Sequence, residues 1–147
     1  MRFKDNKFRF SFEIPEGWNQ EPVGFLTKWL SGVRVSIVPI ERGANMNITC
    51  KSIEGVLAEV GSRDRALLQY LSSMGCEITR SGGISDELGG EMNTTILEYR
   101  NPANKPENIM RKISSVHNSV EYVLTFLGNP EKHDHAYKRV RDSFRFV

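Results

Sequence analysis

The segment VEYVLTFL, residues 120–127, predicts the fold of the chain, because apolar residues occupy both faces of the strand that it would form. Side chains of an extended strand alternate between the two faces of a sheet. One apolar set is Val120, Tyr122, Leu124 and Phe126, and the other is Val123 and Leu127. A strand that is apolar on both faces is covered on both faces. A helix layer on each side of a mostly antiparallel sheet is the simplest arrangement that provides such cover.

The segment after residue 128 predicts one of the covering helices. Asn129 suits the N-cap, Pro130 suits the first helical position, and Glu131 follows in the first turn, where the helix dipole favours an acidic side chain. The apolar stripe expected to face the sheet is Ala136, Tyr137, Val140 and Phe144.

The second covering helix is expected between residues 53 and 74, after Ser52 as N-cap. Gly61 and Ser62 interrupt its apolar stripe. Glycine costs about 1 kcal/mol inside a helix, and serine offers a fresh N-cap. The sequence therefore favours two helices broken at Gly61 over one continuous helix.

The opening stretch KFRFSFEIPEGW, residues 7–18, has two interpretations. Phe8, Phe10 and Phe12 would share one face of a strand, and an aromatic row beside basic residues is typical of a platform on which nucleic-acid bases stack. A sheet covered on both faces buries such a row instead, and burial stabilises the fold by roughly 1.5–3 kcal/mol for each ring. We interpret the row as core. Further strands are expected at residues 23–32, 33–40, 46–50, 76–81, 91–100 and 109–117.

Composition narrows the class of protein. The chain of 147 residues is expected to form a single domain, residues 1–147, and its net charge of +2 argues against nucleic acid as a partner. The apolar runs are too short for membrane insertion, and the charged opening MRFKDNKFRF has no apolar core of a signal peptide, which predicts a cytoplasmic location. Cys50 and Cys76 form neither a disulfide framework nor a zinc motif.

Three motifs in this order resemble one family. They are a strand running into Pro-x-Gly-Trp (FSFEIPEGW, 10–18), a Gly-x-Asn strand before a helix (GANMNIT, 43–49, then SIEGVLAEV, 52–60), and a strand, capped helix and closing Ser-Phe (121–147). Together they resemble the superfamily of PsbP, the oxygen-evolving-complex protein, which also holds the Ran-binding Mog protein and bacterial DcrB-like proteins.

The resemblance implies an α+β fold: an α/β/α sandwich, with helices on both faces of a mostly antiparallel sheet of six to seven strands. It also implies a non-enzymatic binding, assembly or chaperone-type module without a cofactor. The expected partner is another protein, and a homodimer is compatible with this class. No segment of the chain carries over a Ran-binding residue.

Lys138, Arg141 and Arg145 are the candidate partner-binding residues, because this basic stripe of the last helix would suit an acidic partner. Solubility and complementarity to the helix dipole explain the same stripe. The alternative function is metal or small-ligand binding at the start of this helix, where Glu131 and His135 stand four residues apart. The neighbouring His133 would point away from His135.

A cysteine hydrolase is the least favoured function. Cys76, with His117 or another histidine, would have to act as the nucleophile. Cys76 follows the C-terminal end of a helix, where the dipole disfavours a thiolate. A further loop with Asp86, Glu87 and Glu91 is interpreted as a solvated acidic loop rather than a cation site.

Overall fold

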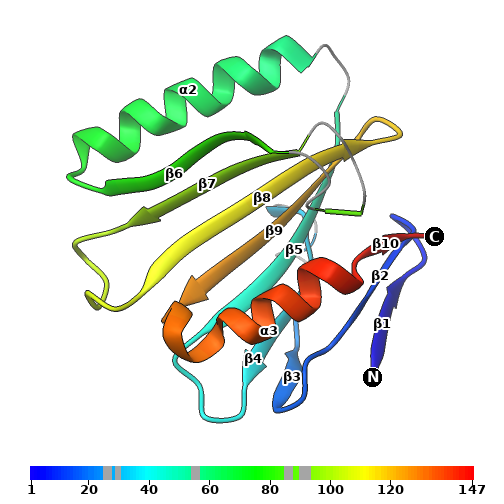
Figure 1. Ribbon diagram of the computed structural model, residues 1–147. Coiled ribbons are helices and arrows are strands. Elements are labelled where there is room, and N and C mark those ends of the chain that lie inside the picture. The colour runs from blue at the N-terminus through cyan, green and yellow to red at the C-terminus, as the bar shows by residue number, and fades with distance from the viewer. Residues whose placement is uncertain (25–27, 29–30, 54–56, 85–87, 90–93) are drawn as a thin grey trace.

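The segment VEYVLTFL forms most of β9, which is the central strand of a seven-stranded sheet in the computed structural model (Figure 1). The structure describes residues 1–24, 28, 31–53, 57–84, 88–89 and 94–147, without the side chains of 57–64 and 84. Across the sheet the strands are β3 (Trp18–Glu21), β4 (Val33–Pro39), β5 (Asn45–Ser52), β9 (Val120–Gly128), β8 (Ile109–His117), β7 (Thr94–Arg100) and β6 (Glu77–Ile84). Each neighbouring pair is antiparallel.

A smaller sheet accounts for both ends of the chain. Its order is β1 (Arg2–Asp5), β2 (Phe10–Glu13) and β10 (Arg145–Phe146). The opening aromatics were expected on one strand, but residues 6–9 form a turn. Arg9 has a φ of 58° there, and the Asp5 carboxylate accepts a hydrogen bond from the Phe8 N–H at 2.8 Å. Phe8 therefore leaves the strand and is half-buried.

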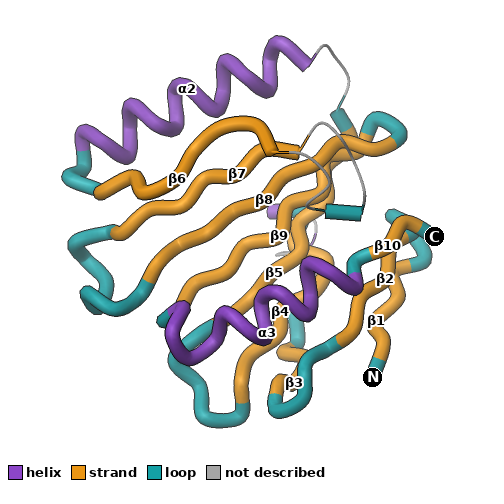
Figure 2. Tube along the Cα trace, in the orientation of Figure 1, coloured by secondary structure: helices purple, strands orange, loops and turns teal. Residues whose placement is uncertain are grey.

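The helix α3 (Pro130–Ser143) covers one face of the large sheet, beside the small sheet (Figure 2). Its predicted cap is confirmed, because the Asn129 side chain accepts a hydrogen bond from the Glu131 N–H at 3.0 Å. The Tyr137 ring packs 5.7 Å from the Phe126 ring. Phe10 and Phe12 are 0% and 1% exposed, so their assignment to the core is confirmed.

The second helix, α2 (Leu57–Ser73), lies alongside β6 at the edge of the sheet (Figure 1). The predicted break at Gly61 is wrong, because the helix runs through it without interruption. Continuous hydrogen bonding along a long helix outweighs the glycine penalty of about 1 kcal/mol. The predicted N-cap is also wrong: Ser52 ends β5 and pairs with Val120.

The strand predicted at residues 23–32 is wrong for the part that the structure describes. Lys28 and Ser31 are helical, and the Lys28 N–H donates to the Gly24 carbonyl at 3.0 Å. The partner of β4 is instead β3, which begins at Trp18.

The α+β fold with a mostly antiparallel sheet is confirmed. Its two faces differ, because α2 does not seal the side opposite α3. Leu124 and Phe126 of β9 are 0% exposed on the α3 side, whereas Val123 and Thr125 are only half-buried on the other. Among the described residues, no helix is both long and apolar enough to cross a membrane.

Candidate functional site

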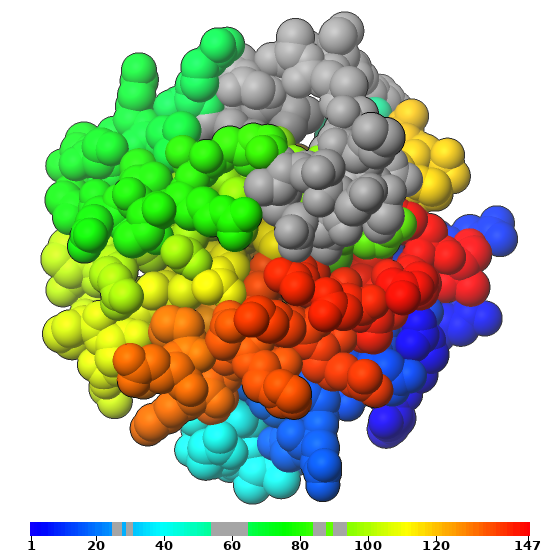
Figure 3. Space-filling model, viewed as in Figure 1, coloured from blue at the N-terminus to red at the C-terminus, as the bar shows by residue number. Residues whose placement is uncertain are grey.

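Basic side chains from both ends of the chain surround one hollow of about 540 Å³. We call this the basic surface, and its lining residues are Arg2, His135, Lys138, Arg139, Asp142, Ser143 and Arg145. They come from β1, α3 and β10. Figure 3 shows the orange and red surface of α3 and β10 beside the blue surface of the N-terminal segment.

Local structure explains how α3 contributes to this surface. His135, Lys138, Arg139 and Asp142 are spaced three or four residues apart, so they share one side of a helix. All of them are exposed. The buried residues of the helix, which include Tyr137 and Val140, hold its opposite side against the sheet.

Arg2 reaches the basic surface through the small sheet. β2 pairs with β1 on one side and with β10 on the other, which places the first residues of the chain next to the end of α3. The Arg2 guanidinium donates to the Ser143 carbonyl at 3.0 Å and to the Glu13 carboxylate at 3.1 Å. Nothing in the sequence signals this contact, because it joins residues 141 positions apart.

The cations of the basic surface differ in their partners. Lys138 forms an ion pair with Asp134 at 3.2 Å, and Arg145 donates to the carbonyls of Asp142 and Phe144 at 2.7 and 2.6 Å. Arg139 forms no ion pair with any residue that the structure describes. It is therefore the cation most available to an incoming carboxylate.

The structure brings two of the three candidate partner-binding residues together. Lys138 and Arg145 line the same hollow, whereas Arg141 is not among its lining residues. The Arg141 guanidinium bonds Asp142 at 3.0 Å and lies 5.9 Å from the centre of the Tyr137 ring. Arg2, Arg139 and His135 join the surface beyond the predicted set.

The alternative site at the start of α3 does not assemble in the described part of the chain. Glu131 and His135 are exposed, and no group of three metal-ligating residues is found among the described residues. His133 is 7% exposed and meets the Trp18 ring edge to face, with 5.6 Å between ring centres. It is a core residue. Asp86, Glu87 and Glu91 lie outside the described residues.

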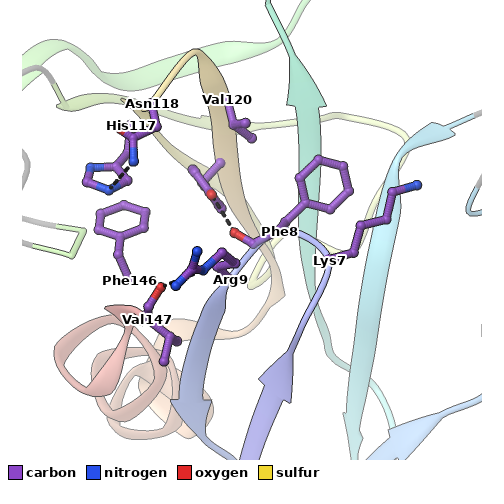
Figure 4. Close-up of a pocket in the computed structure, with 9 residues that line it drawn as sticks. Lys7, Phe8, Arg9, His117, Asn118, Val120, Phe146 and Val147 are labelled. Atoms are coloured by element: carbon purple, nitrogen blue, oxygen red, sulfur yellow. Dashed lines mark hydrogen bonds between the residues drawn. The ribbon is translucent and has the colours of Figure 1, made fainter.

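A second hollow of about 320 Å³ contains His117 (Figure 4). The His117 ring stacks on the Phe146 ring with 3.9 Å between centres. Arg9 donates to the Val147 carbonyl at 3.1 Å, and the Tyr122 hydroxyl donates to the Phe8 carbonyl at 2.6 Å. No cysteine is among the described lining residues of this hollow.

Both cysteines are buried, and Cys50 is expected to resist alkylation in the folded protein. Burial raises the pKa of the Cys50 thiol to about 12, so at pH 8 only about one molecule in ten thousand holds a thiolate. Mass spectrometry after iodoacetamide treatment should find Cys50 unmodified in buffer and modified in urea. Equal modification under both conditions would contradict this placement.

An antiparallel sheet of this topology, with α3 on one face and a second small sheet at the chain ends, has a PsbP-like α+β fold. The fold is similar to the solution structure of cyanobacterial PsbP (CyanoP) from Synechocystis sp. PCC 6803, with a TM-score of 0.70 and 20% sequence identity. That alignment covers 100% of this chain and 92% of the other. The α+β fold that the resemblance of the three sequence motifs implies is thus confirmed.

A second similar structure is a crystal structure from Bacteroides thetaiotaomicron VPI-5482, with a TM-score of 0.51 and 12% identity. It covers 99% of this chain and 48% of the other, so this chain spans about half of that protein. No family model and no curated protein matches the sequence. At these identities the likeness concerns the fold.

Proposed function

We propose that the chain is a non-enzymatic protein-binding or assembly module, which holds an acidic segment of a partner protein on its basic surface. One observation carries the proposal. Four cationic side chains and one carboxylate line a single hollow, whereas the whole chain has a net charge of only +2. A local field of one sign attracts an oppositely charged partner and orients it on approach.

The ion pairs that the basic surface already forms can be replaced by ion pairs with the carboxylates of an acidic segment. Lys138 is 56% exposed in its ion pair with Asp134, and exposed ion pairs contribute only about 0–1 kcal/mol. Exchanging Asp134 for the carboxylate of a partner therefore costs little. Arg139 supplies a planar guanidinium that can bind a carboxylate through two parallel hydrogen bonds.

Reversing two of these charges is expected to weaken binding of an acidic peptide. The variant is Lys138→Glu with Arg139→Glu, and the probe is a fluorescein-labelled twelve-residue peptide of glutamate and glycine. Repulsion replaces attraction at two adjacent positions, so the dissociation constant measured by anisotropy at low salt should rise at least tenfold. Lys132→Glu is the control, because it reverses one charge at an exposed position of α3 outside the hollow.

Two results would refute this function. One is equal peptide binding by the double variant and the Lys132→Glu control. The other is equal binding of a peptide in which glutamine replaces every glutamate. Capture from the source cells then tests the natural partner: a specific protein should be retained by the Lys132→Glu variant and lost by the double variant.

A further inference from the structure

A further hollow lies on the other side of the molecule, between α2 and the face of the sheet opposite α3. Its volume is about 680 Å³, within the range of roughly 300–1,000 Å³ that is typical of small-molecule sites. Val123 and Thr125 of β9 and Lys112 of β8 form part of its floor. Leu67 and Leu68 of α2 form part of its wall.

Small side chains explain why this space stays open. Protein interiors are packed as densely as organic crystals, so short side chains on the facing surfaces favour a hollow here. Ser114 and Thr125 lie on the floor, and glycines 82 and 83 lie at the β6 side. Val123, at the centre of the sheet, is consequently half-buried, whereas its neighbour Leu124 on the opposite face is fully buried.

Lys51, Arg65 and Lys112 are the cations among the described lining residues, and Lys51 and Arg65 are exposed. Lys112 gives the interior of the cavity its charge preference. It is half-buried on the floor, with Leu97 of β7 and Thr125 of β9 as its cross-strand neighbours. Within the described part of the chain, Lys112 forms no hydrogen bond or ion pair through its side chain. A cation that is partly withdrawn from water without a partner is a site for an anion.

The adjacent residue of the same strand, Arg111, is by contrast a cation with carboxylate partners. Its guanidinium points to the opposite face and bonds Glu98 at 2.7 Å and Asp134 at 2.8 Å. The carboxylate among the described lining residues of the cavity is Glu121. It stands four positions before Thr125 on β9, roughly 14 Å along the strand, too far to neutralise Lys112.

We propose that this cavity binds a small amphipathic carboxylate. The carboxylate accepts hydrogen bonds from the Lys112 ammonium, and the apolar body lies over Val123 against Leu67 and Leu68. The charge of Lys112 selects the head group, and the apolar walls of the sheet and of α2 select the body. This site is separate from the basic surface and does not depend on the proposed protein-binding function.

Three probes separate the possible forms of the ligand. Decanoate carries the carboxylate on a flexible chain, 2-naphthoate carries it on a flat ring, and decyltrimethylammonium carries the opposite charge. Titration calorimetry should give a millimolar or lower dissociation constant for at least one carboxylate and at least tenfold weaker binding of the ammonium compound. Amide NMR shifts should concentrate at Lys112, Val123 and Thr125.

The variants test the two parts of the site separately. Lys112→Met removes the charge with little change in size and should raise the dissociation constant of the carboxylate at least tenfold. Lys105→Met makes the same change on an exposed turn and should not alter binding. Thr125→Trp fills the cavity and should abolish binding, with thermal melting used to verify that each variant is folded.

The proposal is overturned if neither carboxylate binds below 10 mM, or if Lys112→Met binds as tightly as the unaltered protein. It is also overturned if the NMR shifts map to Lys138 and Arg139. The Lys138→Glu, Arg139→Glu double variant should bind the carboxylate normally. If the double variant fails to bind the acidic peptide, the inference about the cavity is unaffected. If Lys112→Met fails to bind the carboxylate, the proposed protein-binding function is unaffected.

Discussion

Replacing Phe10 by alanine is expected to lower the free energy of unfolding by about 3–5 kcal/mol, the range for deleting a buried phenylalanine ring. Phe10 is 0% exposed. Its ring stacks on Phe144 with 5.5 Å between centres and lies 5.9 Å from Phe3 and 6.0 Å from Tyr122. These contacts join the small sheet to β9 and to the end of α3, so the cavity left behind would weaken several elements at once.

Urea denaturation followed by circular dichroism measures this loss, and Phe8→Ala is its internal control. Phe8 stands two residues earlier and is only half-buried, and the cations of Lys7 and Arg34 lie 5.5 and 5.2 Å from its ring centre. Its truncation should cost about 1 kcal/mol, because a partly exposed ring removes less apolar area from water. Equal losses for both variants would contradict the placement of Phe10 in the core and Phe8 at its margin.

The sequence was most informative where the signal was local. The alternation of residues 120–127 predicted a strand inside the sheet, and Asn129 and Pro130 predicted the start of α3. Both predictions rest on contacts between residues a few positions apart. The order of strands could not be predicted in this way, because β5 and β9 pair although about seventy residues separate them.

The β1–β2 hairpin was missed although a signal was present. Asp5 and Asn6 are turn-forming residues, and Asp5 does hold the turn by accepting a hydrogen bond from the Phe8 N–H. The alternating phenylalanines suggested one uninterrupted strand and masked this signal. The positive φ of Arg9 has no such signature, because arginine rarely adopts it.

The two functional regions differ in how far a sequence can predict them. The spacing of Lys138 and Arg145 follows from the helix, but Arg2 joins them only through the pairing of both chain ends in the small sheet. The cavity had no signal at all. Periodicity indicates that Val123 lies on a second apolar face of its strand. It does not indicate whether the side chains above Val123 are long enough to fill the space.

The second large effect is expected at Arg111, which links β7, β8 and α3. The guanidinium bonds Glu98 and Asp134 and stands 4.5 Å from the centre of the Tyr137 ring. Only 14% of the Arg111 side chain and 18% of the Glu98 side chain are exposed. Burial alone would raise the pKa of Glu98, but hydrogen bonds from Thr79 and Arg111 and the Arg111 charge lower it below its ordinary value.

Arg111→Met is expected to destabilise the fold by about 3 kcal/mol at pH 7, because it leaves the Glu98 carboxylate partly buried without its cation. The Asp134 carboxylate keeps its ion pair with Lys138 and is therefore destabilised less. A second change, Glu98→Gln, removes the stranded charge and should restore part of the loss. This double-mutant cycle, measured by urea denaturation, separates the ion pair from the packing of the guanidinium on Tyr137. If Glu98→Gln does not restore stability in the Arg111→Met background, packing alone explains the effect.

The pH dependence gives an independent test with a fixed sign. Burial also opposes ionisation of Asp134, yet hydrogen bonds from Arg111 and Lys138 lower the pKa of this carboxyl. Arg111 likewise lowers the pKa of Glu98. A carboxyl whose pKa is lower in the folded state stabilises the fold above its unfolded pKa, near 4, and loses that contribution as the pH falls through the folded pKa. The difference in stability between the unaltered protein and Arg111→Met should therefore be largest above about pH 5 and shrink below about pH 4. A difference that stays constant from pH 7 to pH 3 would mean that the two carboxylates do not depend on Arg111 for their charge.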